Sequence, residues 1–347
     1  MSLLEVENLS AYYITHAYGV QRDVRAVDNI TFSMEENEIV GLAGESGCGK
    51  STLIKVLLAI IKPPLRVLSG QVNYSYDGKK FNLLTLEREQ LRKVQWEDIS
   101  YIPQGSMSTL NPVRKIRKTF EDVIKAHKKS ESREEYERLM EEHIKYLGLP
   151  LEVLDSYPHQ LSGGMRQRTT IALATILKPK IIFADEPTTA LDVVVQRGVI
   201  QMLKQLHEEQ KNTMLIVTHD MAVHANVAEK IAIMYAGKIV EIAEKKELFT
   251  TPKHPYSQFL IQSLPRIGDK RRRTSAPGNP PSLADPPPGC RFHPRCPYVK
   301  DVCKRHIPKL IEYEEYHNKA CFLYSSAIVE GEEIVQEIIR SKKGCKN

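Results

Sequence analysis

Apolar and polar residues follow two different spacings along the chain, and together these spacings predict an α/β fold. Four short runs rich in β-branched residues have the length of buried strands, at residues 38–43, 99–102, 181–184 and 214–217. Between 112 and 149, apolar residues instead recur three and four positions apart, which predicts a helical insertion. Residues 3–9 and 27–34 alternate apolar and polar positions, which predicts antiparallel strands near the N-terminus.

The segment after the first buried strand predicts a phosphate-binding site. Residues 44–51 fit the pattern G-x-x-x-x-G-K-[ST], and apolar residues at helix spacing follow from Leu53. Glycines let the backbone wrap round an anion with its N–H groups pointing inward, at the positive end of the helix dipole. Lys50 is expected to reach the β and γ phosphates, and Ser51 to bind Mg²⁺. The predicted nucleotide-binding residues of this loop are Gly44, Ser46, Gly47, Cys48, Gly49, Lys50, Ser51 and Thr52.

Polar side chains at the ends of three further strands are expected to complete this site. Asp185 and Glu186 follow one apolar run, Gln104 follows another, and His219 follows a third. In an open parallel sheet, ligands bind in the crevice at the carboxyl ends of the strands. Asp185 is expected to hold Mg²⁺, directly or through water, and Glu186 to polarise a water molecule against the γ-phosphate.

Length and composition place the chain among globular proteins with more than one domain. Its 347 residues suit an α/β domain with an appendage. The 49 Lys and Arg residues exceed the 43 Asp and Glu residues by only six, a balance too mild to indicate nucleic acid. No apolar run approaches the roughly 18 residues of a membrane span, and the N-terminus lacks a signal-peptide pattern. We expect a soluble protein that starts inside the cell.

Six short motifs, taken in order, resemble those of the ATP-binding subunit of an ABC transporter. They are similar to the Walker A loop at 44–51, the Q-loop glutamine at Gln104, the signature Leu-Ser-Gly-Gly-Met-Arg-Gln at 161–167, Walker B at 181–186, the D-loop at 190–192 and the switch histidine at His219. A Walker A loop alone indicates only a P-loop NTPase, so the signature carries the resemblance.

The resemblance implies a P-loop NTPase of the ABC nucleotide-binding type, with an antiparallel β subdomain and a helical subdomain at about 105–170. It implies bound ATP and Mg²⁺, with Glu186 as the catalytic base and His219 as the γ-phosphate contact and water orienter. Gln104 would contact Mg²⁺ or water. Tyr13 would stack on adenine, with Tyr12 as the alternative.

The resemblance also implies a second ABC ATPase subunit as a partner. Ser162, Gly163 and Gly164 offer a hydroxyl and backbone N–H groups at a helix start, which is an anion site without its own nucleotide. In a head-to-tail pair, each ATP would lie between one subunit's Walker A loop and the other subunit's signature. Asp192 of the D-loop is expected to belong to this nucleotide site.

Segments of the C-terminal part resemble the oligopeptide and dipeptide branch of ABC importers, at 254–257, 277–281 and 286–297, and so does the run 108–112. We therefore expect an ABC ATPase domain at 1–255 and a C-terminal transporter-type extension at 256–347. The resemblance implies peptide import, with oligosaccharides or nickel as alternative cargo. The implied partners are a second ATPase, two integral membrane permease subunits and an extracytoplasmic solute-binding protein. The chain would be peripheral, on the cytoplasmic face of the membrane, and would bind no nucleic acid.

Four of the six cysteines gather in this extension, at Cys290, Cys296, Cys303 and Cys321. In a reducing compartment such a group points to a metal rather than to disulfides. The spacing C-x5-C-x6-C-x17-C lacks the paired cysteines of most zinc sites, and by itself it leaves an iron–sulfur cluster, zinc and no metal open. The resemblance implies a [4Fe–4S] cluster. The basic run 270–273 is interpreted as solvated, with anionic lipid headgroups as the alternative.

Two other classes of ABC protein compete with the importer. Soluble ABC proteins that act on nucleic acid or ribosomes usually carry two cassettes or a long coiled coil, whereas this chain has one cassette and a short helical insertion. An exporter subunit is disfavoured by the cysteine-rich tail.

Overall fold

The protein is described here by a computed structural model, which covers residues 2–17, 19–105, 109–128, 132–264, 276–324 and 329. The predictions for Ser108 and for the basic run 270–273 lie outside these residues. The chain divides into two compact units. We call them the helical unit (residues up to 4, 34–39 and 74–218) and the phosphate-loop unit (5–33, 40–73 and from 219 onward).

Three parallel strands form the centre of the helical unit: β6 (Ile99–Ile102), β7 (Ile181–Asp185) and β8 (Thr213–Val217). Every residue of β7 and β8 is buried, because strands inside a parallel sheet are covered on both faces. The register sets Ile102 opposite Ala184 and Asp185 opposite Val217. The three strands therefore end at one common edge, as their apolar runs predict.

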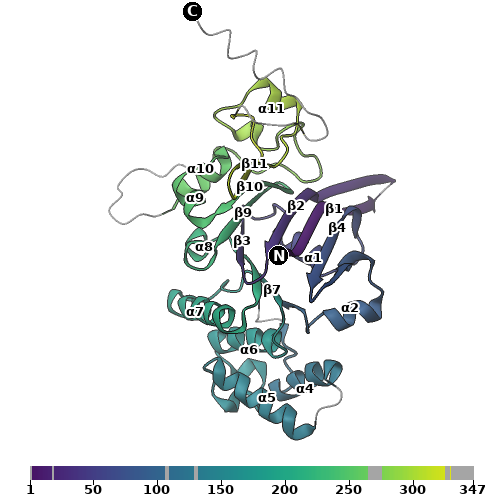
Figure 1. Ribbon diagram of the computed structural model, residues 1–347, viewed down its shortest axis with the longest axis vertical. Helices are drawn as coiled ribbons and strands as arrows, with labels where there is room; N and C mark the ends of the chain where they lie inside the picture. The colour runs from purple at the N-terminus through teal and green to yellow at the C-terminus, as the bar shows by residue number, and fades with distance from the viewer. Residues whose placement is uncertain are drawn as a thin grey trace, which may run out of the picture. The chain divides into compact units, whose positions relative to one another are not determined.

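The predicted helical insertion is confirmed. The helices of this unit are α2 (Arg88–Val94), α4 (Ile116–His127), α5 (Arg133–Tyr146), α6 (Gly163–Thr175) and α7 (Val193–Gln210). Helix α5 packs against both α4 and α6 (Figure 1). It begins with a capping box, in which Ser132 Oγ accepts the Glu135 N–H at 3.3 Å and a Glu135 carboxylate oxygen accepts the Ser132 N–H at 2.6 Å. Buried His143 lies 2.9 Å from Thr175 Oγ1, so this histidine is packed inside the helical unit.

Long N-terminal strands and a hairpin make up the second sheet, in the order β2-β1-β4-β5. The strands are β1 (Ser2–Ala17), β2 (Val20–Glu35), β4 (Leu65–Tyr76) and β5 (Lys79–Asn82). Asp77 and Gly78, with φ of 50° and 71°, join β4 to β5 as a two-residue turn, for which Asp-Gly is a typical sequence.

The phosphate-loop unit places C-terminal strands beside the strand that leads into the phosphate loop. Strand β3 (Ile39–Ala43) pairs in parallel with β9 (Lys230–Tyr235), and antiparallel pairing then continues through β10 (Lys238–Glu244), β12 (His317–Lys319) and β11 (Ile311–Glu314). The helices are α1 (Lys50–Leu57), α8 (Met221–Val227), α9 (Lys245–Thr250), α10 (Pro255–Gln262) and α11 (Asp301–Arg305). The predicted boundary at 255/256 stays a prediction, and β12 pairs with β10 across it.

An aromatic cluster joins these C-terminal segments to β9. The ring centroids of Tyr235 and Tyr256 lie 4.6 Å apart, and the ring of Phe292 lies 5.2 Å from Tyr235 and 5.5 Å from Tyr256. All three side chains are at most 1% exposed. Among the residues that the structure describes, we find no helix with both the length and the apolar character that a membrane span needs.

Candidate functional site

Two glycines of the phosphate loop stand where a side chain has no room. Gly44 follows β3 and Gly49 precedes α1, and both have positive φ, 155° and 112°. A Cβ atom on Gly44 would lie 2.1 Å from the carbonyl oxygen of Met234, and one on Gly49 would lie 2.0 Å from that of Ala26. The loop therefore keeps its curvature only with glycine at these positions.

The Lys50 side chain is held inside the phosphate loop by hydrogen bonds to the loop's own backbone. Its ammonium donates to the carbonyl oxygens of Gly44 at 2.7 Å and Glu45 at 3.0 Å, and the side chain is buried. Cys48 Sγ lies 3.7 Å from the same ammonium. Burial raises the pKa of the Cys48 thiol, so this group stays protonated at neutral pH. A buried cation at a helix N-terminus is suited to bind phosphate.

Tyr12 and Tyr13 have different neighbours on β1. The Tyr13 hydroxyl lies 3.2 Å from Thr52 Oγ1, at the start of α1. The Tyr12 hydroxyl donates to Asp28 at 2.8 Å, and burial together with this carboxylate raises the pKa of Tyr12 to about 12. Of the two, Tyr13 is the one that contacts the phosphate-loop helix.

The predicted acidic residues lie at the common edge of the strands in the helical unit. Asp185 ends β7 and is only 2% exposed, and Tyr101 donates to its carboxylate at 3.5 Å. Burial and this neighbouring carboxylate raise the pKa of Tyr101 to about 12. Glu186 has a positive φ of 48°, and Thr189 Oγ1 donates to its carboxylate at 2.5 Å. Such backbone strain is concentrated at functional sites.

Gln104 and His219 are both exposed, and each follows a strand as predicted. Gln104 comes two residues after β6, at the edge where Asp185 and Glu186 lie. His219 comes two residues after β8 and belongs to the phosphate-loop unit. The helical unit thus brings Gln104, Asp185 and Glu186 to one edge.

The signature residues form the N-terminus of α6. Ser162 is its N-cap, and its hydroxyl accepts the Met165 N–H at 3.2 Å. A Cβ atom on Gly164 would lie 2.7 Å from the side chain of Val195, so this glycine lets α6 approach the start of α7 closely. Asp192 caps α7 and accepts N–H groups of its first turn at 2.9 and 3.0 Å. The signature and the D-loop therefore support each other.

The four cysteines of the extension influence one another electrostatically. Cys303 and Cys321 are buried, and the Cys290 N–H donates to the Cys303 carbonyl at 2.8 Å. Burial raises the pKa values of Cys290 and Cys321 to about 12, and Cys296 and Cys303 add to both shifts. Within the described residues, no set of three or more His, Cys, Asp or Glu side chains converges to hold a metal ion. The expected cluster is therefore not confirmed.

A buried lysine lies beside this cysteine group. Lys319 is 1% exposed, and its ammonium lies 3.4 Å from the ring centre of Tyr313 and 3.6 Å from that of Tyr324. Within the described residues this ammonium has no hydrogen-bond partner. Burial lowers the pKa of Lys319 to about 8, whereas the nearby Cys321 raises it. A buried cation of this kind favours negative charge nearby.

Sequence reasoning missed a contact between the extension and the phosphate loop. The Arg295 guanidinium donates to both carboxylate oxygens of Glu45, at 2.8 and 3.0 Å. The Glu45 N–H donates to the Tyr256 hydroxyl at 2.8 Å. No local pattern signals this contact, because Glu45 and Arg295 are 250 positions apart.

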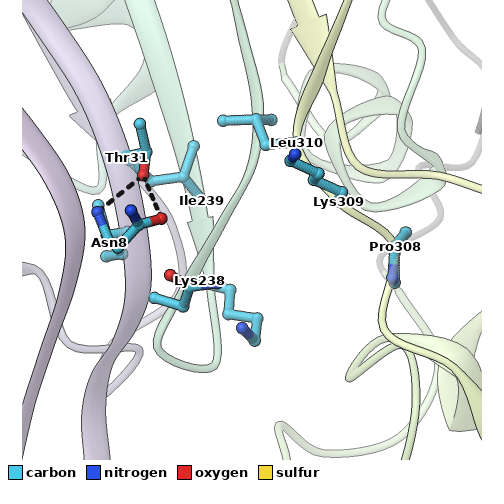
Figure 2. Close-up of a pocket in the computed structure, with 9 residues that line it drawn as sticks. Asn8, Thr31, Lys238, Ile239, Pro308, Lys309 and Leu310 are labelled. Carbon is cyan, nitrogen blue, oxygen red and sulfur yellow. Dashed lines mark hydrogen bonds between the residues drawn. The ribbon is translucent and has the colours of Figure 1, made fainter. Parts of the chain in front are cut away.

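A separate pocket of about 400 Å³ contains none of the predicted site residues. Figure 2 shows Asn8, Thr31 and Ile239 on one side and Pro308 and Lys309 on the other. Thr31 Oγ1 accepts the Asn8 N–H at 2.9 Å within its wall.

Comparisons with known proteins show the family to which the chain belongs. A sequence model of the ABC transporter family matches residues 27–189, and one of the oligopeptide/dipeptide transporter C-terminal region matches residues 240–303. The chain is 42% identical over 324 residues to a dipeptide transport ATP-binding protein, DppD, of Caldanaerobacter subterraneus subsp. tengcongensis, covering 93% of this chain and 97% of that protein. It is 38% identical over 331 residues to the oligopeptide transport ATP-binding protein AppF of Bacillus subtilis, covering 93% and 98%.

A solved structure of an ATP-binding cassette has a similar fold. A dimeric ATP-binding cassette in a post-hydrolysis state, bound to ADP and phosphate, superposes with a TM-score of 0.60 at 29% identity. The likeness covers 70% of this chain and 98% of that one.

Proposed function

The chain belongs to the ATP-binding proteins of ABC transporters, in the oligopeptide and dipeptide branch, and from this premise we propose that it drives peptide import. Membership of the family makes it an ATPase. The main evidence for a peptide cargo is the match of residues 240–303 to the C-terminal region of oligopeptide and dipeptide transporters. Oligosaccharide or nickel cargo has no comparable support.

The proposed nucleotide-site roles rest on the motifs, and the local geometry of several residues supports them. Lys50, with the N–H groups at the start of α1, binds the β and γ phosphates. Ser51 and Asp185 hold Mg²⁺, and the burial of Asp185 beside Tyr101 keeps its carboxylate oriented. Glu186 is the general base for the attacking water.

Three further residues have supporting roles at this site. His219 contacts the γ-phosphate, and Gln104 contacts Mg²⁺ or water. Tyr13 stacks on adenine, which its contact with Thr52 supports over Tyr12.

Replacing Glu186 with Gln tests the assignment of the base. Glu186→Gln is expected to abolish steady-state ATP turnover while ATP binding is retained, because the amide keeps the shape but cannot accept the proton. Phosphate release by the purified full chain measures turnover, and a calorimetric titration measures binding. Glu208→Gln removes the same charge from an exposed position of α7 and serves as the control. Unchanged turnover in Glu186→Gln contradicts the assignment.

The working unit is a head-to-tail pair with a second ABC ATPase subunit. Ser162 and Asp192 are exposed at adjoining helix starts, where they can meet the nucleotide of a neighbouring subunit. The dimeric ATP-binding cassette noted above supports a dimer of ATPase subunits. Two integral membrane permease subunits and an extracytoplasmic solute-binding protein complete the importer. The chain then lies peripherally on the cytoplasmic face of the membrane.

Peptide uptake and copurification test the transport role. Disruption of the gene is expected to abolish uptake of labelled dipeptides and oligopeptides while uptake of the free amino acids continues. Tagged full-length chain is expected to copurify with two membrane subunits and a second ATPase. Loss of oligosaccharide or nickel uptake instead of peptide uptake contradicts the peptide cargo, and copurification with ribosomal proteins contradicts the importer.

The four cysteines are proposed to hold a [4Fe–4S] cluster, with zinc as the lesser alternative. Two observations support a shared site: Cys296 and Cys303 influence the thiols of both Cys290 and Cys321 electrostatically, and Lys319 brings a buried positive charge beside them. Bound iron would keep the thiols deprotonated and so link residues 290–321 across the extension. Iron and acid-labile sulfide in anaerobically purified protein support the cluster. Stoichiometric zinc without iron contradicts it.

A further inference from the structure

We propose that Arg295, in the cysteine-rich extension, is a positioning residue for the phosphate loop, acting through Glu45 on Lys50. The proposal goes beyond the transport role, because it concerns how the ATPase site is built and holds for any cargo or metal. The Arg295 guanidinium lies 5.8 Å from the ring centre of Tyr235 and 5.9 Å from that of Phe292, in the same unit as the phosphate loop.

Glu45 uses each of its polar groups in a different direction. Its carboxylate is paired with Arg295, its N–H is bonded to Tyr256 on α10, and its carbonyl oxygen accepts the Lys50 ammonium at 3.0 Å. The residue that orients Lys50 is thus fixed by two contacts from the extension, one from Arg295 and one from Tyr256 on α10. A shift of Glu45 would move the acceptor that holds Lys50.

Hydrogen bonds on several sides hold the Arg295 side chain in one orientation. Its side chain is 7% exposed, and besides Glu45 it donates to the carbonyl oxygens of Pro277 at 2.7 Å and Ala276 at 3.3 Å. It also donates to the Tyr235 hydroxyl at 3.2 Å. The planar guanidinium matches the carboxylate of Glu45 with two parallel bonds, which a lysine at this position cannot reproduce.

A second arginine of the extension supports the same side of the loop. Arg291 donates to the carbonyl oxygen of Ala236 and to the carboxylate of Asp28. The next residue, Gly237, donates its N–H to the carbonyl oxygen of Cys48 at 2.8 Å. The two arginines between Cys290 and Cys296 therefore both support the phosphate loop, Arg295 directly and Arg291 through the turn between β9 and β10.

The charge of Arg295 leads to an effect on ATP affinity that a packing role alone does not predict. Without the guanidinium, the Glu45 carboxylate remains in the loop without its cation. It then repels the triphosphate and competes with it for Lys50. Removing the Glu45 charge as well ends this repulsion. ATP affinity should therefore suffer more from the single change than from the double change.

The experiment compares MgATP binding by the full-length chain and by variants, using calorimetric titration. Arg295→Ala is expected to weaken binding by about tenfold, equal to about 1.4 kcal/mol, and Arg295→Lys by less. Arg295→Ala/Glu45→Gln is expected to return to within about threefold of wild-type affinity. Lys304→Ala removes a positive charge from an exposed ion pair on α11 and serves as the control, with unchanged affinity expected.

Thermal unfolding without nucleotide shows whether each variant is folded. If Arg295→Ala does not fold, Arg295→Lys replaces it in both the single and the double variant. Wild-type affinity in the single variant overturns the proposal. An affinity in the double variant as low as in the single variant also overturns it, because it assigns Arg295 a packing role only.

Discussion

Replacing buried Glu241 with Gln should destabilise the phosphate-loop unit by a predictable amount. Glu241 lies on β10 and is fully buried. One carboxylate oxygen accepts the Lys253 N–H at 2.6 Å and His317 Nε2 at 2.7 Å, and the other accepts the His254 N–H at 2.9 Å. These bonds join β10 to β12 and to the start of α10, the helix that carries Tyr256.

The size of the effect follows from these three donors. A hydrogen bond to a charged group contributes about 1.5–3 kcal/mol. In Glu241→Gln the amide oxygen can serve one side of the site, but the NH₂ group then faces a donor on the other side, and no bond is charge-assisted. We expect a loss of about 3 kcal/mol in the free energy of unfolding, which lowers the melting temperature by about 6–12 °C.

Urea unfolding of the full-length chain, followed by circular dichroism, measures this loss. Glu314→Gln is the matched control, because its carboxylate forms a half-exposed ion pair with Lys253 at 3.1 Å and should change stability by less than about 0.5 kcal/mol. A Glu241→Gln variant as stable as this control at neutral pH refutes the reasoning.

The pH dependence gives a second check on the same residue. Burial raises the pKa of Glu241, but hydrogen bonds from His317 and from backbone N–H groups outweigh burial and hold the pKa below its ordinary value. A carboxyl group with a depressed folded-state pKa stabilises the fold above its ordinary pKa, and this stabilisation is lost as the pH falls through the folded-state value. The difference between wild type and Glu241→Gln should therefore persist at neutral pH and shrink below about pH 4.5.

Two further predictions concern the phosphate loop and the helical insertion. Gly49→Ala should cost more than about 2 kcal/mol of stability and abolish ATP binding, because its Cβ atom would clash with the Ala26 carbonyl oxygen. The control is Gly163→Ala, whose Cβ atom would have no neighbour within 4 Å, and it should unfold like the wild type. Equal melting temperatures of the two variants would contradict this prediction. Burial lowers the pKa of His143 to about 4. The free energy of unfolding should therefore fall by up to about 3 kcal/mol as the pH drops from about 6.5 to 4, because protons bind this histidine in the unfolded chain first. His143→Gln should flatten this part of the pH profile, measured by urea unfolding.

Elements whose determinants are close together in the sequence could be predicted well. The turn at Asp77 and Gly78 and the capping box of Ser132 and Glu135 each depend on a few neighbouring residues, and both are present. The buried strand β7 is recognised by its continuous apolar run, because a strand covered on both faces has no polar side. The ends of strands were less predictable, since β1 and β2 extend beyond the stretches of clear alternation.

By itself the sequence determined the phosphate loop and the acidic strand end, because the glycines, Lys50 and Asp185 act through spacings of a few residues next to one strand or helix. Only the tertiary structure decided that Glu45 pairs with Arg295 and Glu241 with His317, because no pattern of neighbouring residues marks either pair. The physical reason is that a charged side chain is buried only if a partner is brought to it, and that partner comes from a part of the chain whose position depends on the packing of the whole unit.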